Sequence, residues 1–253
     1  MNHVSTRCLQ RLKHSAYRLL LLTGFEVRCV RHSTPSAPTL SGALWRTRAR
    51  NTQVATVVDV GASDGRWSKQ MLSYYPDAMY VLIEANRHHE LPLRKLCKRY
   101  KNAHAVMAAA GDHAGEAAFE RSSDPFGGRV TARVDNNHMT VPMVTIDDLV
   151  DSRHLQPPFL IKLDTHGFEV QILSGARRTL ENTAVVIIEC YFFRHSDNLL
   201  VAEMMAHMDS LGFRCMDLFD QLYRPGDLAL WQADLTFVKK SSAEFLHNSY
   251  QVR

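Results

Sequence analysis

The most constraining stretch of the chain is an apolar run that leads into an acid and two glycines, residues 57–65 (VVDVGASDG). Residues 53–60 are β-branched and apolar on both faces, which is typical of a central strand in a parallel sheet. Residues 66–75 repeat apolar side chains at helical spacing, and Pro76 ends the predicted helix. A strand, a glycine turn and a helix start together present backbone N–H groups at the positive end of a helix dipole. The stretch therefore predicts an α/β unit with a ligand at the turn.

Glu84 suggests which ligand this is, because it ends a second apolar run about 20 residues beyond the glycine loop. A carboxylate at that place can accept hydrogen bonds from both hydroxyls of a ribose. The dinucleotide pattern G-x-G-x-x-G is absent, since Ser63 stands between glycines spaced G-x-x-x-G, and the phosphate loop pattern is absent too. A loop with its own acids, Asp59 and Asp64, suits a cationic nucleoside without phosphates, and S-adenosylmethionine fits. The alternative is an ordinary β-turn-α unit in which Glu84 has no ligand.

The remainder of the chain alternates between strands and helices. Further strands are expected at 79–83, 103–109, 159–163, 184–188, 213–219 and 234–238, further helices at 86–100, 169–180 and 199–211, and a helix start at 145–148. This alternation predicts an α/β fold with a doubly wound, mostly parallel sheet and helices on both faces. Gly175 lies inside a predicted helix, where it marks close packing. Thr145 is expected to cap the helix that begins there. Residues 115–145 read instead as short strands around a glycine-containing loop, an insertion that could carry the substrate loop.

Acidic residues follow five of these strands. Ligands of such sheets bind at the carboxyl ends of the strands, and the acids at those ends are Asp59, Glu84, Asp112, Asp164 and Glu189. Five acids at one rim indicate a site for a cation, a polyol or a metal. Asp112 could bond the exocyclic amine of an adenine or simply begin a turn, and the sequence favours neither.

The charge of the chain is divided unevenly, and this affects which partners are expected. Residues 1–50 hold nine Lys/Arg and one acid, while the remaining residues hold 21 Lys/Arg and 25 acids. A body without a basic excess gives no reason to expect nucleic acid. Five scattered cysteines without a C-x-x-C spacing favour a reducing compartment and give no indication of zinc. We therefore expect a cytoplasmic protein whose oligomeric state the sequence leaves open.

The first 50 residues are expected to be a basic N-terminal helix and a linker. Residues 17–25 are apolar but interrupted by Arg18, too short to span a bilayer, and not followed by a clean cleavage site. An amphipathic helix that lies on the domain, or that makes peripheral membrane contact through residues 1–30, is expected, and an organellar transit peptide is the alternative. Residues 32–51, rich in Ser, Pro and Arg, read as the linker. The catalytic domain would then span 51–240, and 241–253 would be a C-terminal tail.

At this point the chain resembles the FkbM methyltransferase family, within the class I S-adenosylmethionine-dependent enzymes. The resemblance covers about residues 53–240 and is carried by 57–65 (VVDVGASDG), 83–86 (IEAN), 141–149 (VPMVTIDDL), 161–169 (IKLDTHGFE), 173–176 (LSGA) and 187–189 (IIE). It implies a seven-stranded sheet with one antiparallel strand and methyl donation from S-adenosylmethionine. The acceptor in such enzymes is usually a hydroxyl of a small molecule or saccharide. Many members have an acid at the position of His166, and many class I enzymes have glycine at the position of Ser63.

The residues expected to bind the cofactor are Asp59, Gly61, Ala62, Ser63, Asp64, Gly65, Glu84, Ala85 and Asp112. Methyl transfer needs alignment of the reacting atoms and removal of a hydroxyl proton. His166 is the first candidate base because an imidazole titrates in the useful range, followed by Asp164, Glu189 and His195. A Mg²⁺ ion on Asp164 and Glu189 could replace the base. Two other functions stay open, a nicotinamide-dependent oxidoreductase and a non-catalytic nucleoside-binding protein on the same fold.

Overall fold

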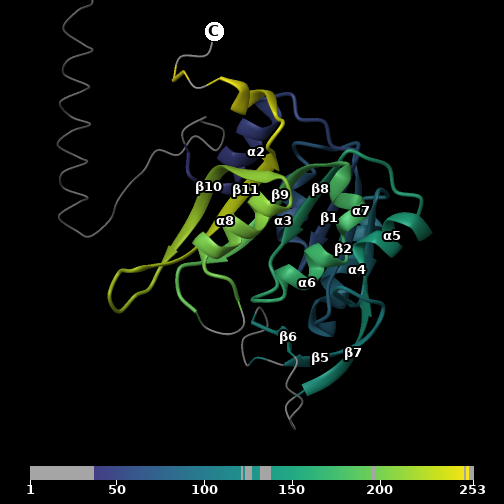
Figure 1. Ribbon diagram of the computed structural model, residues 1–253. Coiled ribbons are helices and arrows are strands. Elements are labelled where there is room, and N and C mark those ends of the chain that lie inside the picture. Colours follow the sequence, from purple (N-terminus) through teal and green to yellow (C-terminus); the bar gives the residue numbers. More distant parts are fainter. Residues whose placement is uncertain are drawn as a thin grey trace, which may run out of the picture.

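A computed structural model of the chain describes residues 37–120, 122, 127–131, 138–194, 198–247 and 249–250. Its centre is a seven-stranded sheet with the order β10-β11-β9-β8-β1-β2-β3 (Figure 1). Its strands are β1 (Thr56–Val60), β2 (Met79–Ile83), β3 (Ala103–Val106), β8 (Phe159–Leu163), β9 (Thr183–Tyr191), β10 (Phe213–Tyr223) and β11 (Leu230–Lys239). Neighbouring strands pair in parallel except at β11, which is antiparallel to both β9 and β10. The predicted fold class and its single antiparallel strand are therefore confirmed.

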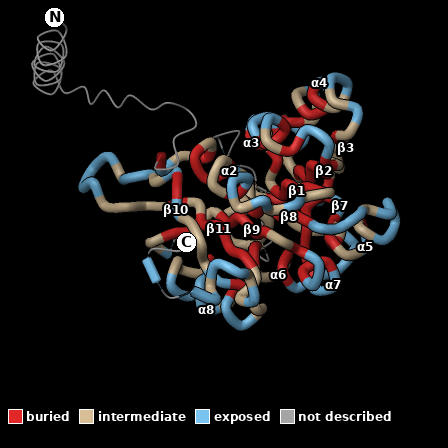
Figure 2. The backbone as a smooth tube through the Cα atoms, turned by 90° about the horizontal axis from the view of Figure 1, so that it is seen from above, coloured by how far each residue is buried: buried red, intermediate tan, exposed pale blue. Residues whose placement is uncertain are grey.

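Helices cover both faces of this sheet. The helices on one face are α2 (Leu40–Ala49), α3 (Arg66–Met71) and α4 (Glu90–Arg99), preceded by the short 3₁₀ turn η1 (Arg87–His89). The helices on the other are α5 (Ile146–Ser152), α6 (Glu169–Ser174), α7 (Arg177–Glu181) and α8 (Val201–Ser210). Alternate residues of the central strands enter the two resulting cores, because successive side chains of a strand point to opposite faces. The central strands are accordingly buried throughout, as Figure 2 shows.

A small second sheet has the order β4-β7-β5-β6 and lies beside the main one (Figure 1). Its strands are β4 (Ala109–Ala110), β5 (Gly115–Glu120), β6 (Arg129–Thr131) and β7 (His138–Val144). The short strands expected between residues 115 and 145 are thus present in the described part of that segment. Residues 123–126 of the expected loop lie outside the described residues.

The linker interpretation was wrong for residues 40–49, which form helix α2. Thr39 caps this helix by accepting a hydrogen bond from the N–H of Gly42 at 3.2 Å. Leu40, Ala43 and Leu44 are buried against the sheet, and Arg46 pairs with Asp217 of β10. Apolar burial and this ion pair make α2 part of the folded domain, so the domain begins before residue 51.

The predicted helix at 169–180 is two helices, which meet at Gly175 and Ala176. A Cβ on Gly175 would lie 2.0 Å from the carbonyl oxygen of Gly111, so the close packing predicted for this glycine is confirmed. The predicted cap is confirmed as well, because Thr145 Oγ1 accepts the N–H of Asp148 at 3.0 Å.

The ends of the chain are only partly described. Residues 1–36, including the predicted amphipathic helix, lie outside the described residues, as does His195. The predicted tail contains a 3₁₀ turn, η2 (Ala243–Leu246), whose Phe245 packs on the core. Every helix in the described ranges is too short or too polar to cross a bilayer.

Candidate active site

The carboxyl ends of the central strands open into a cavity of about 630 Å³. Its walls come from the glycine loop, the residues after β2, the start of β4, the small sheet and the strands β8, β9, β10 and β11. The predicted site residues that line it are Gly61, Ala62, Ser63, Glu84, Ala85, Asp164, His166 and Glu189. The structure thus brings the glycine loop and three of the four candidate bases to one cavity.

Glu84 is a buried carboxylate held by two backbone donors. Its Oε2 accepts the N–H of Ser63 and its Oε1 accepts the N–H of Asn86, both at 2.7 Å. Burial raises the pKa of Glu84, and these two N–H donors act in the opposite direction. Each oxygen retains a lone pair for a further donor, so the carboxylate is positioned to bind two neighbouring hydroxyls.

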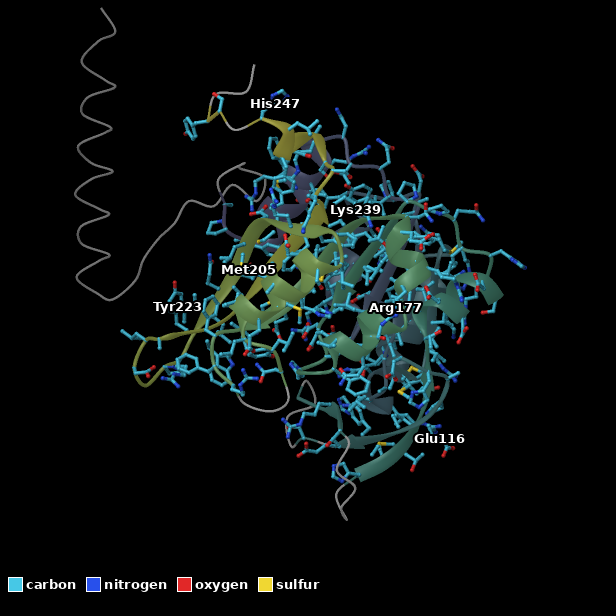
Figure 3. All side chains as sticks on the ribbon, viewed as in Figure 1. Glu116, Arg177, Met205, Tyr223, Lys239 and His247 are labelled. Atoms are coloured by element: carbon cyan, nitrogen blue, oxygen red, sulfur yellow. The ribbon has the colours of Figure 1, made fainter. Side chains whose placement is uncertain are left out.

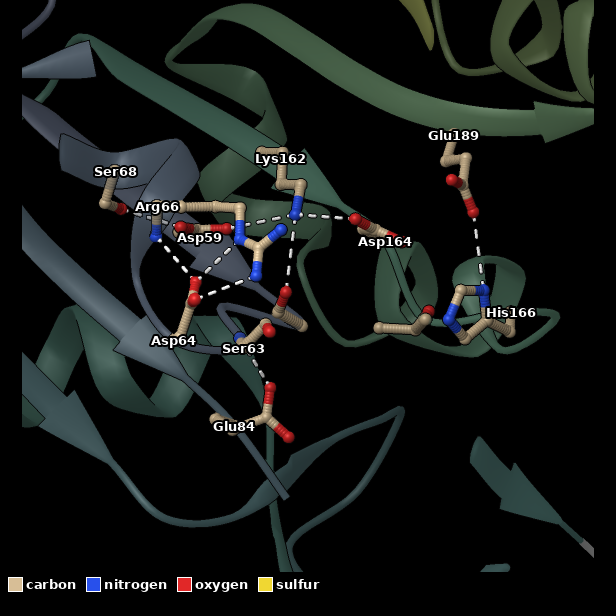
Figure 4. A network of polar contacts seen from close by, with 12 residues as sticks. Asp59, Ser63, Asp64, Arg66, Ser68, Glu84, Lys162, Asp164, His166 and Glu189 are labelled. Carbon is tan, nitrogen blue, oxygen red and sulfur yellow. Dashed lines mark hydrogen bonds and ion pairs between the residues drawn. The ribbon is translucent and has the colours of Figure 1, made fainter. Parts of the chain in front are cut away.

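Lys162 extends from the buried strand β8 to a point between Asp59, Asp164 and the glycine loop (Figure 4). Its Nζ lies 3.0 Å from Asp164 Oδ2, 3.4 Å from Asp59 Oδ1 and 3.3 Å from the carbonyl oxygen of Gly61. Burial lowers the pKa of Lys162, but the two carboxylates outweigh burial and the net pKa is raised. Lys162 is therefore a cation that joins the glycine loop to the end of β8.

Asp59 serves this buried network and does not line the cavity. It is fully buried, and its Oδ2 accepts the hydroxyl of Ser68 in α3 at 2.6 Å. In β1 it stands directly beside Lys162 in the parallel register. Its carboxylate is directed beneath α3, where it contacts Ser68 and Lys162.

Asp164, His166 and Glu189 form the second polar group of the cavity. One ligand-type atom from each residue lies within 4.8 Å of the others. Burial would raise the pKa of Asp164, but Lys162 and His166 outweigh it and the pKa is lowered. Burial and the neighbouring Asp164 raise the pKa of Glu189. Of these two carboxyl groups, Asp164 is therefore the more acidic, and Glu189 holds its proton more tightly.

Glu189 and His166 are held by side chains from β9 and β11. His166 Nδ1 lies 2.7 Å from the hydroxyl of Tyr191 and 3.3 Å from Glu189 Oε2. The Tyr191 hydroxyl donates to the same Oε2, and the Gln232 side-chain amide donates to Oε1. His166 itself has a left-handed backbone, with φ of 59°, in the turn between β8 and α6. Such a conformation is uncommon for a residue other than glycine and often occurs at functional sites.

Three more of the predicted cofactor residues do not line the cavity. Asp64 pairs with Arg66 at 2.9 Å, and Gly65 packs against Leu96 of α4. Asp112 is exposed beside His113. At the third strand end the cavity wall is formed instead by Ala108, Ala109 and Ala110.

The sequence reasoning missed Lys162, Tyr191 and Gln232. Lys162 is the single charged residue inside an otherwise apolar strand, FLIKL, and a lone charge in a buried strand could have marked it as a site residue. Tyr191 stands two residues after Glu189 in β9, so alternation places both side chains on one face. Gln232 has no local signal, because only the pairing of β11 with β9 brings it to Tyr191.

Comparisons with known proteins agree with the resemblance seen in the sequence. Residues 59–215, more than half of the chain, match the family model of the methyltransferase FkbM domain. A 78-residue segment is 31% identical to the hexuronic acid methyltransferase AglP of Haloferax volcanii, covering 30% of this chain and 32% of that protein. The aligned part is therefore about one third of the length of that relative.

A solved structure of this family has the same fold, and a second solved methyltransferase is similar at a lower TM-score. The methyltransferase FkbM of Methylobacillus flagellatus has a TM-score of 0.50 at 19% identity, over 72% of this chain and 43% of that one. The 1,6-didemethyltoxoflavin-N1-methyltransferase of Burkholderia thailandensis has a TM-score of 0.45 at 13% identity, over 94% of this chain and 90% of that one. The match of the family model to most of the domain confirms the resemblance and removes the oxidoreductase alternative. The chain belongs to the FkbM methyltransferase family.

Proposed function

We propose that the protein transfers a methyl group from S-adenosylmethionine to a hydroxyl oxygen of a small molecule or saccharide. The observation that carries the proposal is the shared cavity, in which Glu84 lies across from the group of Asp164, His166 and Glu189. One side thus offers a ribose handle, and the other offers proton acceptors.

The residues present fit S-adenosylmethionine. Glu84 would accept the two ribose hydroxyls, and Gly61, Ala62, Ser63 and Ala85 would contact the nucleoside through the loop and the strand end. Gly61 has φ of 74°, and a Cβ there would lie 1.9 Å from the carbonyl oxygen of Asp164. Ser63 Oγ and Trp67 Nε1 belong to cavity-lining residues and are buried without a hydrogen-bond partner among the described residues. Buried polar atoms normally have hydrogen-bond partners, so polar atoms without one at a closely packed loop are suited to bind a ligand.

The chain contributes alignment and proton transfer to the reaction. Bound S-adenosylmethionine supplies an electrophilic methyl carbon next to a positively charged sulfur. The cavity walls hold the acceptor oxygen in line with that carbon, which accounts for much of the rate gain in reactions of this kind. His166 accepts the hydroxyl proton, a step for which a positioned base typically contributes ~10²–10⁴-fold.

A hydroxyl acceptor suits the charges of the cavity better than a carboxylate does. Asp164 and Glu189 lie beside His166, and Asp164 is held ionised, so an anionic reacting group next to His166 would be repelled. The name of the Haloferax relative supports a saccharide as the acceptor molecule. We therefore expect a sugar hydroxyl or a comparable alcohol to be methylated.

Calorimetry with S-adenosylhomocysteine tests the cofactor site. Glu84→Gln should weaken binding roughly 10- to 100-fold, because hydrogen bonds to a charged group are worth about 1.5–3 kcal/mol. Glu116→Gln is the matched control, since Glu116 is exposed on the small sheet, away from the cavity wall (Figure 3). Equal affinities in the two variants would contradict the ribose role of Glu84.

Isotope-labelled methyl donor tests the reaction. Incubation with fractionated metabolite extracts should label a product that keeps its label in hot alkali, because a methyl ether survives and a methyl ester releases methanol. A label lost in alkali would contradict the hydroxyl acceptor, and binding of the cofactor without any transfer would favour the non-catalytic alternative.

The same assay tests the Mg²⁺ alternative. The ligand-type atoms of Asp164, His166 and Glu189 are close enough together to hold a cation. If His166 is the base, turnover should be unchanged by EDTA and strongly reduced in His166→Gln. Loss of turnover with EDTA and its return with Mg²⁺ would favour the metal.

A further inference from the structure

The end of the β10–β11 hairpin, residues 222–229, is an exposed apolar surface that we call the hairpin tip. It projects beyond the helices of the domain (Figure 1) and carries Leu222, Tyr223 and Leu228, which are 52%, 53% and 75% exposed. Successive residues of a strand point to opposite faces, so Leu222 and Tyr223 make both faces of the tip apolar. A tip of this kind is suited to enter an apolar medium.

Leu228 is explained neither by burial nor by the conformation of the turn. Its backbone is left-handed, with φ of 58°, although its side chain is 75% exposed. Glycine and asparagine adopt this conformation readily, whereas a bulky side chain is strained in it. A leucine here costs stability and gains little packing inside the domain. Strain of this kind is typical of functional positions, and here it indicates a contact outside the domain.

The turn of the hairpin tip is held in a fixed shape, and its acid is paired. Arg224 Nε donates to Asp227 Oδ1 at 3.0 Å, and the Arg224 guanidinium lies 4.0 Å from the centroid of the Phe193 ring. The N–H of Ala229 donates to the same Oδ1 at 3.1 Å. The tip is therefore a preformed surface in which the charge of Asp227 is balanced by Arg224.

A basic segment of the chain joins the fold close to this tip. The carbonyl oxygen of Pro38 accepts the N–H of Asp220 in β10 at 3.0 Å. Asp220 precedes Tyr223 by three residues, which is roughly 10 Å along a strand. The sequence before Ala37, residues 1–36, holds six Lys/Arg and one acid. Lys and Arg near an anionic bilayer strengthen binding to it, so this charge complements the apolar tip.

We infer that the hairpin tip docks on the surface of an anionic lipid bilayer, with Leu222, Tyr223 and Leu228 at the boundary of headgroups and acyl chains. Tyrosine is favoured at this depth because its ring is apolar and its hydroxyl stays hydrated. Such contacts combine buried apolar area with attraction between basic groups and anionic lipids. Leu222 also lines the active-site cavity, so docking brings the cavity to the bilayer surface. The inference does not depend on the proposed methyl transfer.

Co-sedimentation of the full-length protein with vesicles of phosphatidylcholine and phosphatidylserine tests the inference. The wild type should bind these vesicles, and more weakly at high salt because salt screens the charges. The double variant Tyr223→Ser, Leu228→Asn should bind roughly tenfold more weakly or worse, because the tip no longer buries two large apolar side chains. Asparagine suits the left-handed backbone of residue 228, so this variant should fold.

Leu91→Gln is the matched control, since Leu91 is 69% exposed on α4, far from the hairpin (Figure 1). It should bind the vesicles as the wild type does. A wild type that does not bind, or a double variant that binds as tightly as the wild type, overturns the inference. If vesicles are not bound and the wild type is a dimer that dissociates in the double variant, the tip is a contact between two copies instead.

Fluorescence separates contact through the tip from contact through residues 1–36 alone. Tyr223→Trp, at the end of the hairpin (Figure 3), should be quenched by vesicles with brominated acyl chains more strongly than the wild type. Leu91→Trp should show no quenching beyond that of the wild type. Equal quenching of the two tryptophan variants would place the tip away from the lipid and overturn the inference.

Discussion

Lys162 shows how one buried cation pairs with two carboxylates. A buried ion pair gains stability only when the attraction offsets the loss of hydration, and removing one partner typically costs about 3–5 kcal/mol. Here one ammonium serves both Asp59 and Asp164, with Ser68 donating to Asp59 as well. Asp59 is accordingly a structural partner of the site, although its place at a strand end suggested a cofactor ligand.

Asp234 is a carboxyl that this cation does not neutralise. It is half-buried opposite Glu189 in the β11–β9 pairing. Burial, together with Asp164 and Glu189, raises its pKa well above the ordinary value, and Lys162 only partly opposes this. In the unfolded chain the same group ionises near pH ~3.9. Between that pH and its folded pKa, the folded state retains a proton that the unfolded state has lost.

Asp234→Asn should therefore stabilise the protein at pH 8 and have little effect near pH 4. The ionisation penalty of Asp234 grows as pH rises through this interval and is constant above the folded pKa. A shift of one pKa unit corresponds to about 1.4 kcal/mol, or roughly 3–6 °C in melting temperature for a chain of this size. Thermal unfolding at both pH values is the measurement, with the exposed Asp77→Asn as the control. A gain at pH 4 equal to that at pH 8 would contradict the pKa argument.

The sequence predicted the charged residues of the site better than their neighbours. Glu84, Asp164 and His166 follow strands, Glu189 lies near the end of β9, and parallel strands bring their carboxyl ends to one edge. Lys162 lies within β8 and Tyr191 is the last residue of β9, where position alone does not distinguish a site residue from a core residue. Their roles depend on which strand lies alongside, and that requires the three-dimensional pairing.

The break between α6 and α7 is an example of tertiary packing overriding local preference. Its glycine, Gly175, lies against Gly111, just after strand β4 at the cavity wall. Replacing Gly175 by alanine would by itself stabilise the protein by about 0.4–1 kcal/mol, because alanine lowers the conformational entropy of the unfolded chain. The clash with the Gly111 carbonyl oxygen opposes this gain, because backbone cannot move aside as a flexible side chain can.

Gly175→Ala should thus lower the free energy of unfolding by about 1–3 kcal/mol, the usual result of overpacking. Gly226→Ala is a suitable control, since an added Cβ there meets nothing within 4 Å. Urea denaturation of both variants measures the difference. Equal stability of the two would mean that the contact at Gly175 relaxes without penalty.

Helix α2 was missed for a reason that composition explains. It follows Pro38, contains Gly42 and two arginines, and is followed by Arg50, so its segment resembles a linker. Its buried residues Leu40, Ala43, Leu44 and Thr47 nevertheless repeat at helical spacing behind the cap Thr39. The strands β1 and β8, by contrast, are apolar on both faces and could be predicted with correct C-terminal ends.

For the whole molecule, α2 connects the beginning of the described chain to its end. Leu44 is fully buried in the core beneath the sheet, and Arg46 pairs with Asp217 of β10 at 2.6 Å. Arg50 lies 3.5 Å from Glu244 in the last turn. Asp220 of the same strand accepts the N–H of Leu40 and lines the cavity, so α2 also supports one wall of the site.

Leu44→Ala should lower the free energy of unfolding by about 2–5 kcal/mol, because the lost methyl groups leave a cavity in a core that collapses only in part. Leu91→Ala is the matched control, since Leu91 is 69% exposed, and its effect should stay within about 0.5 kcal/mol. Urea denaturation followed by circular dichroism measures both. A single transition that shifts as a whole in Leu44→Ala would show that α2 belongs to the same cooperative unit as the sheet. A Leu44→Ala variant as stable as the control would instead show that the domain folds without α2.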